Sequence, residues 1–84
     1  MGYYVYLIVS KVKKKTISYV GYTKNIYNRI NLHNKGKGAK FTKGKKWKLI
    51  YLRKFISKRD AMIEEYKLKK NYKLRKKIKL DAKI

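Results

Sequence analysis

The first part of the chain contains two predicted strands separated by a lysine-rich connection. Residues 3–9 are a continuous run of aromatic and aliphatic side chains, which is typical of a strand covered on both faces. The polar stretch KVKKK at residues 11–15 turns the chain, and residues 16–22 resume strand character. The simplest arrangement of the two strands is an antiparallel hairpin with a lysine-rich loop.

Alternation along these strands decides which side chains lie on the same face. On the first strand, one face carries Tyr4, Tyr6 and Ile8, and the other carries Tyr3, Val5, Leu7 and Val9. On the second strand, Tyr19 and Gly21 share a face. Both strands thus carry tyrosines at alternating positions, among them Tyr6 on the first and Tyr19 on the second.

A helix is predicted to follow the second strand. Thr23 or Asn25 can begin it, since either side chain accepts a hydrogen bond from a free amide of the first turn. Four residues then recur at the spacing of a stripe that faces a core, namely Ile26, Arg29, Ile30 and His33. Arg29 and His33 should therefore point at the edge of the core, and the helix should end near residues 34–36.

The second half of the chain repeats the order of loop, strand and helix. Residues 35–46, KGKGAKFTKGKK, form a glycine- and lysine-rich loop, and residues 47–55 alternate like a strand. A second helix is expected over residues 57–70, because Ser57 is followed three residues later by an acid, as in a capping box. The basic extension at residues 71–84 has the pattern of a short docked helix or of a frayed end.

The strong positive charge of this small domain indicates an anionic partner. The 84 residues predict one domain, 1–84, which buries only about 60% of its surface on folding. Lys and Arg number 26 against 4 Asp and Glu, a formal charge of +22 that repels itself unless an anion compensates it. An AT-rich coding sequence explains the many lysines but not the scarcity of acids. Nucleic acid is therefore the first candidate partner and a membrane surface the second.

Several kinds of site are excluded by composition. The chain has no cysteine and one histidine, which excludes disulfides, thiolate chemistry and multi-histidine zinc sites. The longest apolar run is too short to span a bilayer and has no cleavage-site pattern. We therefore expect a soluble intracellular protein, cytoplasmic and, in a prokaryote, associated with the nucleoid.

The polar residues that remain are suited to hydrolysis of a phosphodiester. A carboxylate such as Glu65 can hold one hard cation, Mg²⁺ or Mn²⁺, and Arg29 offers a permanent planar charge to phosphate oxygens. A phenol among so many cations should lose its proton more readily than a free one. Tyr6 or Tyr19 is then a candidate general base with His33 as its proton partner.

A simpler explanation exists for the acid. Glu65 could merely pair with Lys69 at i+4, which stabilises a helix by only about 0.2–0.5 kcal/mol. However, Glu65 shares the apolar stripe of its predicted helix with Ala61 and Leu68, whereas Glu64 faces water. This placement favours Glu65 as the metal ligand.

Five short motifs in order resemble the GIY-YIG nuclease superfamily, in particular its small stand-alone bacterial branch. They are Tyr4-Val5-Tyr6, Tyr19-Val20-Gly21, Arg29 with His33, the segment GKGAKFTKGKKWKL, and Ala61-Met62-Ile63-Glu64-Glu65-Tyr66. The resemblance covers the chain up to about Lys70. It departs from the family at Tyr4, where the first motif has glycine, and at Asn71, which follows Glu65 too closely to be the family's late asparagine.

The resemblance implies a fold, an activity and a set of site residues. The family fold is an α+β arrangement, a three-stranded antiparallel sheet flanked by helices, which agrees with the element order above. The family's catalytic residues correspond to Tyr6, Tyr19, Arg29 and His33, and its metal-binding glutamate corresponds to Glu65. One divalent cation, Mg²⁺ or Mn²⁺, is the implied cofactor.

Lysines of the glycine-rich loop are candidates for contact with nucleic acid. These lysines, with one from the second helix, are Lys35, Lys37, Lys40, Lys43, Lys45, Lys46 and Lys69. A glycine-permissive backbone with Phe41 and Trp47 available for stacking suits a flap that grips a strand. A solvated connector is the ordinary alternative for such a loop.

Three functions compete. The first is a DNA endonuclease with little sequence preference, because 84 residues leave no room for a separate reading domain; substrate choice would rest on shape, strandedness or a protein partner. The second is a non-catalytic binder of DNA or RNA that uses the same basic face. The third, a membrane-active cationic peptide, is disfavoured by the good strand signals.

Overall fold

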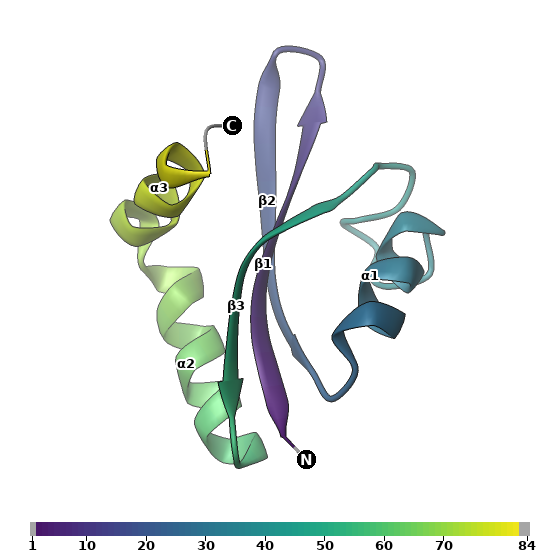
Figure 1. Cartoon of the computed structure of the whole chain (residues 1–84). Helices are drawn as coiled ribbons and strands as arrows, with labels where there is room; N and C mark the ends of the chain where they lie inside the picture. The colour runs from purple at the N-terminus through teal and green to yellow at the C-terminus, as the bar shows by residue number, and fades with distance from the viewer. Residues whose placement is uncertain (1, 83–84) are drawn as a thin grey trace.

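The computed structural model describes residues 2–82 and contains a three-stranded antiparallel sheet between helices (Figure 1). The elements in chain order are β1 (Tyr3–Val12), β2 (Lys15–Thr23), α1 (Ile26–Asn34), β3 (Lys48–Phe55), α2 (Lys58–Lys70) and α3 (Tyr72–Asp81). Strand β1 lies in the centre, paired with β2 on one side and β3 on the other. The predicted α+β fold is confirmed.

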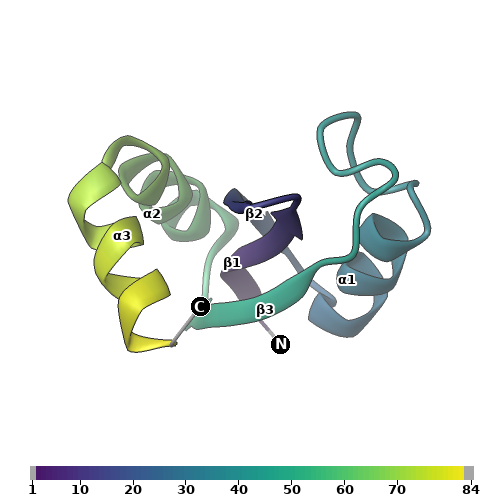
Figure 2. The same cartoon turned by 90° about the horizontal axis from the view of Figure 1, so that it is seen from above.

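The two faces of the sheet are covered by different helices. Helix α1 lies on one face, and α2 and α3 lie on the other (Figure 2). The core on the α2 face consists of Val5, Leu7, Val20, Ala61 and Leu68, and the core on the α1 face consists of Tyr6, Ile8, Ile26 and Trp47. The odd- and even-numbered residues of β1 thus enter separate cores, as alternation predicted.

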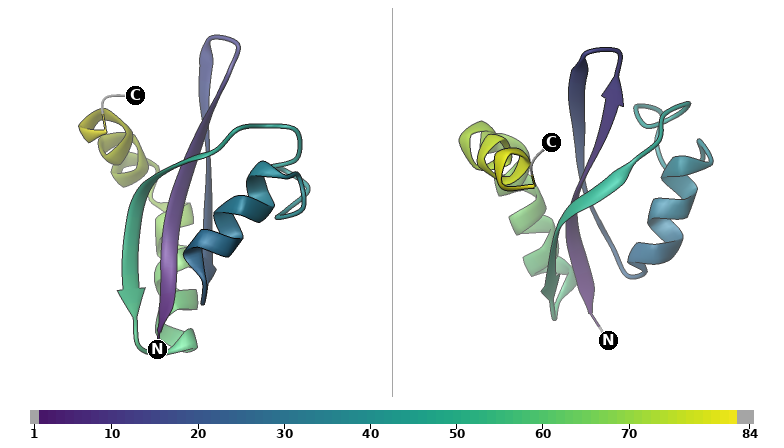
Figure 3. Two further views of the ribbon diagram at one scale, coloured as in Figure 1. Left: turned by 45° about the vertical axis from the view of Figure 1, so that its right-hand side comes forward. Right: turned by 45° about the horizontal axis from the view of Figure 1, so that its top comes forward.

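The β1–β2 hairpin is longer than the hydrophobic pattern indicated. The ladder continues to the pair Val12 and Lys15, so that only Lys13 and Lys14 form the turn. Backbone hydrogen bonds continue where the apolar side chains end, which is why a prediction from side chains placed all of residues 11–15 in the loop. Lys13 adopts a φ of 59°, a left-handed conformation that is uncommon for a residue with a Cβ. The turn of the hairpin lies beyond the ends of the helices, as Figure 3 shows, so Lys13 and Lys14 lie away from both cores.

Strand β3 begins at Lys48, one residue later than predicted. The backbone N–H of Trp47 donates to Asn34 Oδ1 over 2.6 Å, and the Trp47 indole is buried in the α1-side core. Trp47 therefore joins the loop to the end of α1 before the sheet resumes.

Side chains begin both predicted helices where the sequence indicated. Asn25 Oδ1 accepts from the N–H of Asn28 over 3.1 Å at the start of α1, and Thr23 Oγ1 accepts from the N–H of Asn25 over 3.2 Å. Ser57 Oγ accepts from the N–H of Asp60 over 3.1 Å at the start of α2. These bonds satisfy amide groups that a helix leaves free.

The basic extension forms a docked helix. Asn71 ends α2 and begins α3, because its Oδ1 accepts from the N–H of Leu74 over 3.0 Å. Arg75 donates to the carbonyl oxygen of Leu68 over 3.0 Å, and Ile78 packs against the core of the α2 face. Residues 83–84 of the extension lie outside the described residues. Within residues 2–82, no helix has the length and apolar character that a membrane crossing requires.

The difference in burial between two leucines leads to a stability prediction. Leu7 is 0% exposed in the central strand, whereas Leu80 is 65% exposed on α3. We expect Leu7→Ala to lower the free energy of unfolding by about 2–5 kcal/mol, because it removes buried methyl groups and leaves a cavity. Leu80→Ala is the matched control and should change it by less than about 0.5 kcal/mol. Urea unfolding measures both, and equal effects would contradict the assignment of the core.

Candidate active site

A pocket of about 520 Å³ gathers polar side chains from both sides of the sheet. Tyr6, Tyr19, Arg29 and Glu65 all line it, and they come from β1, β2, α1 and α2 respectively. Because α1 and α2 cover opposite faces (Figure 2), the pocket must open where β2, an edge strand, leaves room between them. Four of the five predicted site residues therefore meet in one place, and the fifth, His33, lies behind Tyr6.

Tyr6 is fully buried and its hydroxyl has a defined partner. The Tyr6 Oη lies 2.8 Å from His33 Nε2, at hydrogen-bonding distance. Tyr6 pairs in register with Gly21 of β2, and a Cβ at Gly21 would lie 2.3 Å from the Tyr6 Oη. Only glycine leaves space for the phenol at this position. The pairing of Tyr6 with Gly21 is thus required by steric fit.

The expectation that surrounding cations would favour the Tyr6 phenolate is wrong. Burial raises the pKa of the Tyr6 phenol well above its usual range, and the charges of Tyr19 and Glu65 act in the same direction. The guanidinium of Arg29 opposes this rise but is outweighed. Most of the lysines are on exposed parts of the chain, where solvent screens them, so desolvation decides the protonation of Tyr6. At neutral pH Tyr6 therefore carries its proton.

His33 is fully buried between strand and loop. Its Nε2 faces the Tyr6 hydroxyl, and its Nδ1 lies 2.9 Å from Thr42 Oγ1 in the loop at residues 35–46, called the lysine loop below. A Cβ at Gly38 would lie 2.3 Å from His33 Nδ1, so the loop passes directly against the ring. Burial lowers the pKa of His33, and the charge of Arg29 lowers it further. The imidazole is therefore neutral at neutral pH.

Tyr19 links the pocket to the exposed part of the loop. Its ring lies 5.1 Å from the His33 ring and 6.2 Å from the Phe41 ring, the latter in a stacked arrangement at 22°. Phe41 is 52% exposed, whereas Trp47 is 5% exposed and donates its Nε1–H to the carbonyl oxygen of Thr42. Trp47 is therefore a core residue, and the expectation that it could stack on a ligand is wrong.

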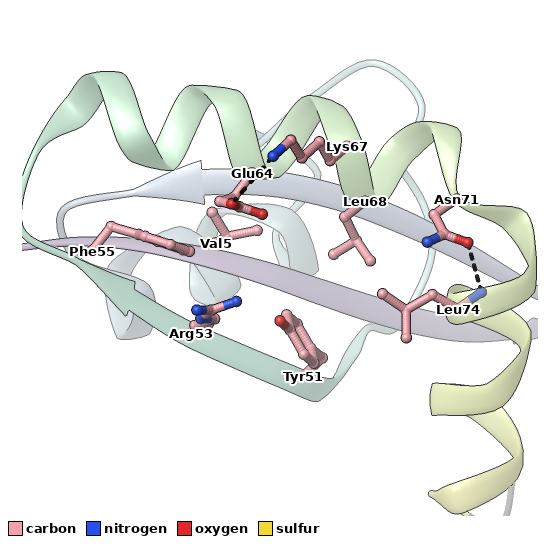
Figure 4. Close-up of a pocket in the computed structure, with 9 residues that line it drawn as sticks. All are labelled: Val5, Tyr51, Arg53, Phe55, Glu64, Lys67, Leu68, Asn71 and Leu74. Atoms are coloured by element: carbon pink, nitrogen blue, oxygen red, sulfur yellow. Dashed lines mark hydrogen bonds and ion pairs between the residues drawn. The ribbon is translucent and has the colours of Figure 1, made fainter.

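Glu65 lines this pocket, and the adjacent acid Glu64 does not. The Glu65 side chain is 17% exposed and lies 3.6 Å from Lys69 Nζ, while the Glu64 side chain is 35% exposed and lies 3.8 Å from Lys67 Nζ. Glu64 lines a separate cavity of about 190 Å³ with Tyr51 and residues of β3, α2 and α3 (Figure 4). The two adjacent acids thus belong to different sites.

The donor set around Glu65 fits a cation that keeps most of its water ligands. Within residues 2–82, no three His, Asp or Glu side chains converge as a cage. Glu65 is a single carboxylate in a pocket of about 520 Å³ that also holds the Tyr6 and Tyr19 phenols. Mg²⁺ is commonly bound by one or two carboxylates, with water and phosphate oxygens completing its shell. The pocket leaves room for such ligands.

The loop at residues 35–46 exposes most of its lysines around a buried Thr42. Five of the six predicted lysines are exposed, namely Lys35, Lys37, Lys40, Lys43 and Lys46. Lys45 is half-buried, and its ammonium donates to the carbonyl oxygen of Phe41 over 3.1 Å. Lys69, the predicted contact on α2, is paired with Glu65.

Sequence reasoning did not identify Thr42, Gly38 or Lys58. Lys58 lines the pocket from the start of α2, and the other two contact His33. The segment GKGAKFTKG indicated a flexible, basic loop, and nothing in its spacing indicated that Gly38 and Thr42 contact His33.

Comparison with known proteins assigns the family. Residues 2–79 match the family described as the GIY-YIG catalytic domain, and the chain therefore belongs to this family, which is part of a nuclease superfamily. Members of that superfamily generally use divalent metal ions. The resemblance seen in the five motifs is thereby confirmed.

Several bacterial proteins are similar to this chain. UPF0213 protein OB0043 of Oceanobacillus iheyensis is 41% identical over 68 residues, which cover 80% of this chain and 76% of that relative. UPF0213 protein SH2523 of Staphylococcus haemolyticus is 46% identical over 68 residues, covering 80% and 79%. UPF0213 protein YazA of Bacillus subtilis is 47% identical over 53 residues, covering 62% and 54%. These names state no activity, and no solved structure matches the chain significantly.

The contact between the loop and His33 predicts the effect of a methyl group. We expect Gly38→Ala to push the imidazole away from Tyr6, because the added Cβ would lie 2.3 Å from His33 Nδ1. The His33 ring resonances in an NMR spectrum should shift, and the free energy of unfolding should fall by about 1–3 kcal/mol.

Gly44→Ala is the control for this experiment. Gly44 has a φ of +77°, so alanine strains the backbone there, but its Cβ would meet no atom within 4 Å. Gly44→Ala should therefore leave the His33 resonances in place. Identical spectra for Gly38→Ala and the wild type would contradict the packing of the loop against the ring.

Burial of His33 also predicts a dependence of stability on pH. The pKa of His33 is lowered in the folded state, whereas the unfolded chain has a histidine pKa of about 6.5. As the pH falls from about 7.5 to about 5.5, the unfolded chain takes up a proton that the folded protein does not, so the free energy of unfolding should decrease. Urea unfolding at constant ionic strength measures this. His33→Gln, which is neutral throughout, should show a flatter response, and a wild-type response as flat as that of His33→Gln would contradict the burial of a neutral imidazole.

Proposed function

We propose that this protein is a metal-dependent DNA endonuclease with little sequence specificity. The observation that supports it most is the shared pocket: Glu65 comes from the helix on one face of the sheet, and Arg29 comes from the helix on the other. Packing alone gives no reason for an acid, a guanidinium and two phenols to line one cavity of about 520 Å³. A scissile phosphate with a cation beside it would use all of them.

Each side chain has a role suited to its surroundings. The Arg29 guanidinium would bind and neutralise the non-bridging phosphate oxygens, since its charge is permanent and its donors are planar. Tyr6 would take a proton from the attacking water while its own proton passes to His33, which lies 2.8 Å away. Tyr19 would hold its hydroxyl toward the phosphate from the opposite strand. Glu65 would bind the divalent cation, whose positive charge would stabilise the negative charge that develops on the phosphate.

The charge of the chain supports DNA as the substrate. A formal charge of +22, with exposed lysines along the loop at residues 35–46, favours contact with a phosphate backbone. Phosphate contacts carry no base information, so the choice of substrate would depend on DNA shape, strandedness or a protein partner. A basic protein that binds DNA or RNA without cleaving it is the outcome that the following experiment separates.

The adjacent acids of α2 provide a matched test of catalysis. We expect Glu65→Gln to lower the cleavage rate by at least about 10²-fold with Mg²⁺ or Mn²⁺, because it removes the charged ligand from the pocket. Glu64→Gln removes the same charge from the preceding residue, which lines the separate cavity of about 190 Å³. This variant should cleave at the wild-type rate. Single-stranded, duplex and branched DNA are all offered as substrates.

Binding is measured beside cleavage in the same samples. Glu65→Gln should bind DNA at least as well as the wild type, since it carries one negative charge fewer. Equal cleavage by Glu65→Gln and the wild type would identify a contaminating nuclease or another mechanism. DNA binding by the wild type without cleavage of any substrate would leave a non-catalytic binder.

A further inference from the structure

Thr42 is a fully buried threonine whose hydroxyl takes part in three hydrogen bonds. The backbone N–H of Ala39 donates to Thr42 Oγ1 over 3.2 Å, and Thr42 Oγ1 donates to the carbonyl oxygen of Ala39 over 3.0 Å. The third contact is with His33 Nδ1 at 2.9 Å. Because the residue lies in the lysine loop, these bonds connect that loop to the imidazole.

The number of protons on the hydroxyl decides the direction of the third bond. A hydroxyl has one proton to donate and two lone pairs that accept. The bond to the Ala39 carbonyl uses the proton, and the bond from the Ala39 N–H uses one lone pair. With both bonds to Ala39 formed, only a lone pair remains for His33, and Nδ1 is then the ring nitrogen that carries a proton.

The other ring nitrogen then faces Tyr6 without a proton. In a neutral imidazole with Nδ1–H, Nε2 can only accept, and it lies 2.8 Å from the Tyr6 hydroxyl. The Tyr6 phenol therefore donates to His33. In the opposite tautomer, Nε2–H would donate to Tyr6, and the Thr42 hydroxyl would turn from the Ala39 carbonyl to Nδ1, so the phenol would no longer donate to His33. Among these four groups, that arrangement has one hydrogen bond fewer.

We propose that Thr42 is a positioning residue that holds His33 as the Nδ1–H tautomer, so that Nε2 accepts the proton of Tyr6. The role in catalysis rests on the proposed function, because it takes Tyr6 as the base. When Tyr6 accepts a proton from water, its own proton moves to Nε2, so the phenol ends neutral and the imidazole becomes imidazolium. The proton is returned to solvent after the products leave.

Two further observations support this assignment. Burial keeps the pKa of the Tyr6 phenol high and that of His33 low, so both groups are neutral before the reaction. A phenol that holds its proton is a base only if a neighbour takes that proton at the same time. Among residues 2–82, the ionisable groups placed beside His33 are Arg29, Tyr6 and Tyr19, and none of them is a carboxylate that could hold the imidazole in the opposite tautomer.

The tautomer can be observed directly, because His33 is the only histidine of the chain. A ¹⁵N NMR spectrum of the neutral ring, recorded without DNA or metal, distinguishes a protonated nitrogen from one with a free lone pair. The wild type should show a proton on Nδ1 and a free lone pair on Nε2. Thr42→Val has the same shape without the hydroxyl, and its ring should show a mixture of tautomers or the opposite one.

Cleavage is the second measurement. Thr42→Val should cleave DNA about 10²-fold more slowly at unchanged DNA affinity, which is the lower range of what a proton-transfer partner contributes. Thr42→Ser restores the hydroxyl and should recover both the tautomer and most of the rate. Thr16→Val is the control variant, because it makes the same substitution at another threonine, on β2 in the hairpin.

Several results would overturn the proposal. A wild-type spectrum with the proton on Nε2 does so without any variant, and so does a Thr42→Val ring that keeps Nδ1–H alone. If Thr42→Val does not fold, Thr42→Ala is measured in its place with the same criteria. Because the spectrum needs no substrate, a wild type that shows Nδ1–H but cleaves nothing would overturn the nuclease function and leave the role of Thr42 toward His33 standing.

Discussion

The hydrogen bond between the Tyr6 hydroxyl and His33 Nε2 is the contact on which the site depends. It joins the central strand of the sheet to the last turn of α1 through two side chains that are both buried. A buried phenol and a buried imidazole each need a partner, because an unpaired polar group in the interior is costly. The pair meets this need for the side of the ring that faces the sheet, and Thr42 meets it for the other side.

Two glycines, one beside each ring, make the contact between Tyr6 and His33 possible. Gly21 lies where a Cβ would overlap the Tyr6 hydroxyl, and Gly38 lies where a Cβ would overlap the His33 ring. Neither requirement arises from a turn, since both concern close approach of a backbone to a ring. The sheet and the lysine loop therefore close on the two polar rings with nothing between them.

Strong positive charge is the other constraint on this chain. The described residues show two ion pairs, each within one turn of α2, so most lysines have no acid to compensate them. Repulsion of this kind opposes the compact state and favours any polyanion that lies along the surface. Exposed basic residues lie on the β1–β2 hairpin, on the loop at residues 35–46 and on α2 and α3. The pocket itself is different, because there burial outweighs the charge of Arg29 and keeps Tyr6 protonated.

Local rules determined much of the molecule from the sequence. Period-two alternation in residues 3–9 and the caps at Asn25 and Ser57 act over a few residues, so strand faces and helix starts followed from them. Ordered motifs also identified four side chains that line the pocket, those of Tyr6, Tyr19, Arg29 and Glu65. Tertiary structure decided what depends on neighbours distant in the chain: the burial of Trp47, the docking of α3, and the raised pKa of Tyr6. Desolvation and close packing depend on the whole fold, and that is why the partnership of Thr42 with His33 could be seen only in three dimensions.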